Sequence, residues 1–126
     1  MSRHKNSKDD YVRTLSKVES LLARGDDEAY KELFRLMDYP DLAVIRAAAR
    51  SLINGWGLEG LTDVIGFASR ADDQVGGSIW WEITEARALR GYDPWAALDH
   101  RSPMAKENDR SQMSAYVRSM EAIDAG

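Results

Sequence analysis

Apolar residues recur at intervals of three and four along most of the chain, the spacing that places them on one face of an α-helix. The first run extends from Tyr11 to Leu22, between Asp9-Asp10 and Gly25. No segment alternates apolar and polar residues as a strand does. The pattern predicts an all-α protein with helices over about residues 9–24, 26–38, 41–54, 58–68, 73–90 and 113–123, and a short helix that begins at Pro94.

Capping residues support several of these helix ends. Asp41 can accept a hydrogen bond from the first turn of the third predicted helix. Asp93 followed by Pro94 is a well-formed start signal, because proline suits the first helical position. Gly60 and Gly66 lower the helix propensity of the fourth predicted helix, so we expect tertiary packing to stabilise it.

The helical segments repeat loosely along the chain. Gly25, Gly57 and Gly91 each precede a helical segment, with spacings of 57−25=32 and 91−57=34 residues. Periods of this length are typical of stacked helical repeats. The unit is a helix, an Asp-marked turn and a second helix, and Ser102-Pro103 cuts the third unit short. We expect the last helix to lie across the end of the stack as a cap.

Two segments, GDDEAYKELFRLMDYPDLAVIRAAARSLING and GLEGLTDVIGFASRADDQVGGSIWWEITEARALRG, resemble HEAT-type repeats, in which an Asp-containing turn precedes a second helix rich in small residues and leucine. The matching positions of the first are Asp41, Val44, Arg46, Ala48 and Leu52. The second departs at Gly76-Gly77 and Trp80-Trp81. The resemblance implies a short right-handed stack of antiparallel helix pairs, a HEAT-like α-solenoid with a C-terminal capping helix. HEAT-like proteins bind macromolecules through a concave face and include scaffolds, regulatory subunits and a few DNA-repair enzymes.

Length and composition favour one domain. A chain of 126 residues is long enough to bury a core, so we expect a flexible basic tail over residues 1–8 and a single all-α domain over 9–126. The absence of cysteine excludes disulfides and thiolate metal sites. No stretch is apolar for long enough to span a bilayer, and no apolar leader follows the N-terminal charges. These features predict a cytoplasmic protein.

The charge of the chain is asymmetric. The formal net charge is −4, but residues 26–126 carry 11 Lys and Arg against 18 Asp and Glu. An acidic body disfavours a groove that follows nucleic-acid phosphates.

The sequence contains no recognisable catalytic or cofactor motif. There is no glycine-rich phosphate loop and no nucleophile turn, and the only histidines are His4 and His100. Carboxylate pairs occur at helical spacing, Glu82 with Glu85 and Glu59 with Asp63. Without a Glu-x-x-His pattern they predict a solvated acidic face rather than a metal site or acid-base chemistry. We therefore expect neither an enzyme nor a cofactor.

The adjacent tryptophans are the strongest candidates for a binding site. Successive helical residues are about 100° apart, so Trp80 and Trp81 point in different directions. If Ile79 and Ile83 define the core stripe, Trp81 lies about 200° from it. Either the C-terminal helix covers Trp81, with Gly77 making room, or Trp81 is an exposed anchor for a partner.

Trp56 and Trp95 lie near the repeat glycines. They either cover the ends of helix pairs or form an edge platform for a peptide or a base.

Arginines recur on the two second helices, at positions Arg46, Arg50, Arg87 and Arg90. They could line up as a basic ridge that contacts phosphates. Alternatively, Arg46 and Arg50 pair with acids of adjoining turns such as Asp38 and Asp41.

The leading hypothesis is a protein-protein interaction module that uses Trp80, Trp81, Glu82 and Glu85 to bind a basic protein, as a bacterial immunity protein or antitoxin-type inhibitor would. Charge complementarity would speed such association. Neutralisation of the acidic ridge by internal arginine pairs would remove this argument. The alternative is nucleic-acid binding through the arginine ridge and a stacked tryptophan, and a third possibility is a structural subunit. The pattern does not specify the oligomeric state.

Overall fold

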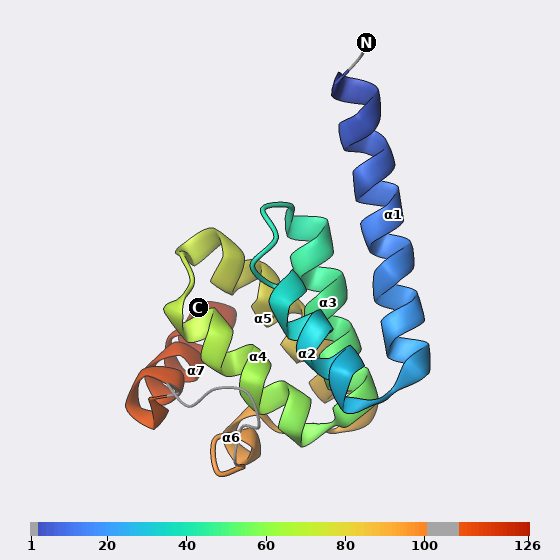
Figure 1. The fold of residues 1–126 in the computed structure, drawn as a ribbon. Coiled ribbons are helices and arrows are strands. Elements are labelled where there is room, and N and C mark those ends of the chain that lie inside the picture. Colours follow the sequence, from blue (N-terminus) through green and yellow to red (C-terminus); the bar gives the residue numbers. More distant parts are fainter. Residues whose placement is uncertain (1–2, 101–108) are drawn as a thin grey trace.

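The computed structural model describes residues 3–100 and 109–126, with side chains from residue 12 onward. The described residues form helices and connecting turns, without a strand. The helices are α1 (Arg3–Arg24), α2 (Asp27–Leu36), α3 (Leu42–Trp56), α4 (Leu58–Arg70), α5 (Asp73–Arg90), α6 (Pro94–Ala97) and α7 (Arg110–Ala125) (Figure 1). The prediction of an all-α protein is confirmed.

Aspartates begin most of these helices. The side chain of Asp41 accepts a hydrogen bond from the backbone N–H of Ala43 at 2.8 Å, and Asp93 does the same for Trp95 at 3.1 Å. Each bond satisfies one of the amides that a helix leaves free at its first turn. The same capping occurs at Asp26, Asp72 and Asp109. The starts predicted at Asp41 and at Asp93-Pro94 are confirmed.

The three repeat glycines share a positive φ angle. Gly25, Gly57 and Gly91 have φ angles of 65°, 64° and 72°, and no other described residue has a positive φ. Glycine adopts this conformation without the steric cost that a Cβ atom brings. They follow the last residues of α1, α3 and α5, so the spacing seen in the sequence marks three helix ends. The turns differ, because ψ is −134° at Gly57 and 19° at Gly91.

Most helix ends lie within about three residues of the prediction, and the start of α1 differs most. Helix α1 begins at Arg3 rather than Asp9, because no proline or glycine interrupts the chain before Gly25. The residues predicted as a flexible tail therefore largely continue this helix. Helix α6 ends at Ala97, after one turn, and the chain then tightens through hydrogen bonds to carbonyls three residues back, such as His100 N to Ala97 O. Ser102-Pro103 lies outside the described residues.

Helices α3 and α4 occupy the centre of the fold. Helix α3 packs against α1, α2, α4 and α5, and α4 also contacts α5, α6 and α7 (Figure 1). Their facing side chains, including Leu52, Ile53, Leu61 and Ile65, are completely buried. Burial of each such side chain stabilises the fold by about 1.5–3 kcal/mol. This packing explains why α4 is helical despite Gly60 and Gly66.

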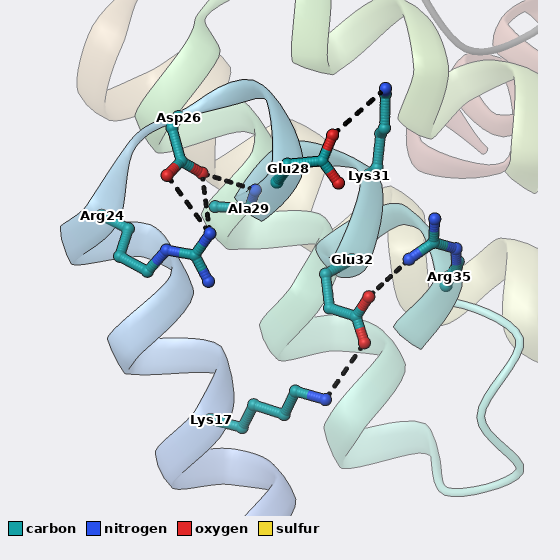
Figure 2. Close-up of polar contacts among 8 residues, drawn as sticks. All are labelled: Lys17, Arg24, Asp26, Glu28, Ala29, Lys31, Glu32 and Arg35. Atoms are coloured by element: carbon teal, nitrogen blue, oxygen red, sulfur yellow. Dashed lines mark hydrogen bonds and ion pairs between the residues drawn. The ribbon is translucent and has the colours of Figure 1, made fainter.

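The outer face of α2 is charged but largely paired (Figure 2). Glu32 accepts from Lys17 of α1 at 3.0 Å and from Arg35 of its own helix, and Arg24 pairs with Asp26 at 3.2 Å. The hydrogen bond from Lys17 lowers the pKa of the Glu32 carboxyl. Exposed pairs of this kind contribute at most about 1 kcal/mol each. Because these charges satisfy one another, this surface offers few unpaired groups to a partner.

A buried polar contact joins α2 to α4. The hydroxyl of Tyr30 donates a hydrogen bond to the carboxylate of Asp63, which is completely buried. The predicted solvated pair of Glu59 and Asp63 is therefore wrong, since only Glu59 is exposed. Asp63 faces inward because α2 packs over that side of α4, as the Phe34–Phe67 ring contact also shows.

The fold should lose stability at alkaline pH. Burial raises the pKa of Tyr30 and of Tyr116 well above the ordinary tyrosine value, and at Tyr30 the hydrogen bond to Asp63 adds to the rise. Above about pH 10 these tyrosines ionise in the unfolded chain first, so the free energy of unfolding should fall by up to about 1.4 kcal/mol per pH unit for each. Urea unfolding across this range measures the slope. The slope should be smaller in Tyr116→Phe, and an unchanged slope in the double variant Tyr30→Phe/Tyr116→Phe would contradict the assignment.

Candidate functional site

The candidate site lies where α3 and α5 pack side by side. Contacts follow the same order along both helices: Arg46, near the start of α3, meets Glu82, and Asn54, near its end, lines a hollow with Arg90. Helix α3 extends from the Asp41 cap to Gly57, and α5 extends from the Asp72 cap to Gly91. These local signals set both helix ends, so the side chains between them meet in a fixed register.

Glu82 is the buried centre of the site. Its side chain is only 2% exposed, and its Oε2 accepts hydrogen bonds from Arg46 Nε at 2.9 Å and Arg46 Nη2 at 2.7 Å. The Nε atom of Arg50, one turn further along α3, lies 3.4 Å from Glu82 Oε1. Oε2 is thus satisfied by hydrogen bonds, whereas Oε1 has an ion pair at this distance but no hydrogen bond. Paired charges of this kind make a buried carboxylate less costly. Glu82 therefore holds two guanidinium groups at the surface of α3.

This arrangement corrects two predictions. Arg46 and Arg50 pair with Glu82 across the helix interface rather than with Asp38 and Asp41. The Asp41 carboxylate is occupied in capping α3. The expectation of an exposed acidic face at Glu82 is also wrong, because the residue points toward α3. Of the pair Glu82 and Glu85, only Glu85 is exposed.

A hollow of about 80 Å³ lies beside Glu82. Arg50, Arg90 and Glu85 contribute its polar walls, and Ile53, Ala86 and Leu89 contribute apolar surface. A space of this size holds a few water molecules or a short side chain. Arg90 has no ion-pair partner among the residues that the structure describes, so its charge faces the hollow uncompensated by a direct pair.

Trp81 is exposed to solvent. Its exposed fraction is 65%, and that of Leu89, two turns later, is 75%. Trp81, Glu85 and Leu89 follow one another at intervals of four and so share one side of α5. No atom lies within 4 Å of the position that a Cβ of Gly77 would occupy. The interpretation in which the C-terminal helix covers Trp81 is therefore wrong, and Gly77 makes room for no neighbour.

Helix α7 covers Trp80 instead. Trp80 is buried, its Nε1 donates a hydrogen bond to Asp124 at 2.7 Å, and its ring meets that of Tyr116 edge-on at 5.9 Å. The Tyr116 hydroxyl in turn donates to the carbonyl oxygen of Gly76 at 2.6 Å. Trp80, predicted as a partner-binding residue, is thus committed to the contact between α5 and α7.

The two remaining tryptophans also pack against the body. Trp56 meets Tyr30 edge-on at 5.0 Å, and Trp95 Nε1 donates to Glu121 at 2.8 Å. Both are partly buried against the core. These contacts agree with the interpretation that they cover the ends of helix pairs.

The predicted arginine ridge is only partly assembled. Arg46 and Arg50 share Glu82, and Arg50 and Arg90 line the same hollow. Arg87 pairs with Glu121 of α7 at 3.2 Å and so belongs to another side of α5. The sequence could have suggested the Arg46–Glu82 pair, since their separation of 36 residues is close to one glycine spacing.

The described residues contain no group of three or more potential metal ligands, and His100 is exposed. None of the described helices combines the length and apolar character needed to cross a membrane. The surface of α3 and α5 brings together an exposed indole, an exposed leucine, arginines paired with Glu82 and a small hollow. Comparison with known protein families, curated proteins and solved structures finds no significant match.

Proposed function

We propose that this protein is a small HEAT-like module that binds another protein through the exposed side of α3 and α5, with Trp81 as its central anchor. The observation that carries the proposal is the 65% exposure of Trp81 on a helix that packs against α3 and α4 through its buried side. Tryptophan is enriched among the residues that dominate interface binding energy. Leu89 extends the apolar surface, and the arginines beside it supply polar contacts.

The register of the helices supports the HEAT-like part of the proposal. Phe34 meets Phe67, 33 residues further on, and Arg46 meets Glu82, 36 residues further on. Both separations are close to the glycine spacings of 32 and 34 residues. A stack in which each repeat packs on the next requires such contacts one period apart.

The partner class follows from the charges that remain at the surface. The expectation of a basic partner rested on Glu82 and Glu85, but Arg46 and Arg50 neutralise Glu82. An immunity- or antitoxin-type inhibitor of a cationic target would thus depend on Glu85 and on the net charge of −4. The binding face itself is a stronger argument for protein recognition than the bulk charge.

Nucleic-acid binding remains the second candidate. Helix α3 carries Arg46 and Arg50, and α5 carries Arg90 together with the exposed Trp81. An exposed indole can stack on a base. Binding through about three phosphate contacts should weaken roughly 20- to 40-fold between about 50 and 200 mM salt. Fluorescence anisotropy with a labelled oligonucleotide measures this dependence.

Trp81→Ala should weaken partner binding strongly without changing the fold. Tagged wild-type protein is used to recover partners from its native lysate, and the affinity of each is measured by titration calorimetry. We expect Trp81→Ala to lose at least about 2 kcal/mol of binding free energy, roughly 30-fold in affinity. Because the indole is exposed, the melting temperature should stay close to that of wild type.

Ile123→Ala is the matched control. Ile123 is a large apolar side chain on α7 with 67% exposure, similar to that of Trp81. Its removal should leave binding unchanged. Equal recovery of the same proteins by wild type and Trp81→Ala would rule out this binding site. Nucleic acid in the eluate, detected by absorbance at 260 nm and released by salt, would favour the second candidate.

A further inference from the structure

We infer that the partner presents a carboxylate beside an apolar side chain, as an acidic peptide segment does, and that this carboxylate binds at the hollow between α3 and α5. The inference rests on the proposed protein-binding function and adds the chemistry of the partner. It reverses the polarity that the acidic composition suggests, because the charges at this surface differ from the charge of the whole chain.

The first argument is the orientation of two arginines. Arg46 directs its Nε and Nη2 atoms at the buried carboxylate of Glu82, and Arg50 Nε lies 3.4 Å from Glu82 Oε1, an ion pair without a hydrogen bond. Their side chains are nevertheless 41% and 55% exposed. Glu82 acts as a positioning residue that fixes one edge of the Arg46 guanidinium by two hydrogen bonds and keeps the Arg50 guanidinium within ion-pair distance. Groups held in place before binding lose less conformational entropy when a ligand arrives.

The second argument is the hollow beside these arginines. Arg90 reaches it from α5 opposite Arg50 on α3, so a carboxylate seated there would meet guanidinium groups from both helices. Guanidinium is well matched to carboxylate because it can donate two parallel hydrogen bonds. Ile53 and Leu89 add apolar walls that an apolar side chain of the partner can contact. The volume of about 80 Å³ admits a short side chain.

The third argument is the local balance of charge. The charged residues that line the hollow are Arg50, Arg90, Glu82 and Glu85, a balance of 2−2=0, whereas the whole chain carries −4. Arg46, outside the lining, pairs with Glu82. A polyanion such as a nucleic acid would meet the acidic body beyond this small patch. A single carboxylate in the hollow would meet Arg50 and Arg90, with Glu85 and the apolar side chain of Leu89 beside it. The geometry therefore favours an acidic peptide over nucleic acid.

A selection experiment tests both the polarity and the site. A phage library of random peptides is selected on immobilised wild-type protein and depleted on Trp81→Ala. We expect enriched peptides to carry Asp or Glu next to large apolar residues. In titrations with a selected peptide, Arg90→Gln should weaken binding about tenfold, and Glu85→Gln should strengthen it several-fold. Glu85 and Arg90 are both exposed, so both variants should fold as wild type does, which thermal melts verify.

The alternative outcomes are distinct. Trp81-dependent peptides rich in Lys or Arg, weakened by Glu85→Gln, would overturn this inference and leave the proposed function intact. An absence of any Trp81-dependent peptide would overturn both. Tighter binding of a single-stranded DNA oligonucleotide, weakened by Arg90→Gln, would replace the acidic peptide with nucleic acid.

Discussion

Gly60→Ala is expected to lower the free energy of unfolding by about 3 kcal/mol or more. A Cβ atom at Gly60 would lie 2.0 Å from the carbonyl oxygen of Leu52 and 2.6 Å from its carbonyl carbon. Both are backbone atoms of α3, so no side-chain rotation can relieve the overlap. The central helices α3 and α4 would have to separate and expose part of the core. Urea unfolding followed by circular dichroism measures the loss.

Gly77→Ala makes the same chemical change with the opposite expected sign. Gly77 lies within α5 on its exposed side, with open space where a Cβ would be. Alanine in a helix interior is favoured over glycine by about 0.5–1 kcal/mol, so this variant should be more stable than wild type. Equal unfolding midpoints for the two variants would show that α3 and α4 do not approach this closely.

The contrast between these glycines shows what could be predicted from the sequence. Glycine in a helical segment signals lost helix propensity, which the pattern detected at Gly60. Whether the position is a close helix crossing or an open surface depends on residues far away in the chain. Helix ends were predictable at Asp41 and Gly91 because capping and positive φ are decided within a few residues.

The candidate site was predicted only in part, because its key contacts are not local. Helical arithmetic placed Trp81 opposite the core, but only the position of α7 decides that Trp80 is covered and Trp81 exposed. For Arg46, the sequence offers Asp38 and Asp41 as the nearest acidic partners. The true partner, Glu82, lies on the buried side of α5, where a charged residue is unexpected and weakens the amphipathic signal.

The double variant Arg46→Met/Arg50→Met is expected to lose about 3 kcal/mol of stability at neutral pH. Methionine keeps much of the apolar stem of arginine, so the change mainly removes charge. It would leave the Glu82 carboxylate buried without a cation, and removal of one side of a buried pair is strongly destabilising. Chemical denaturation of wild type and the double variant measures the difference.

Adding Glu82→Met to that variant should restore most of the lost stability. Replacement of a complete buried ionic cluster by apolar residues of similar volume is often neutral or stabilising, whereas half of a cluster is not tolerated. Recovery in the triple variant would therefore assign the loss to the uncompensated carboxylate. A triple variant no more stable than the double would assign it instead to packing of the arginine stems. The restored fold would also lack the positioned arginines, so it should bind acidic peptides poorly while still exposing Trp81. Glu82 contributes to stability and to recognition through the same two arginines, and the triple variant would retain the stability while losing the recognition.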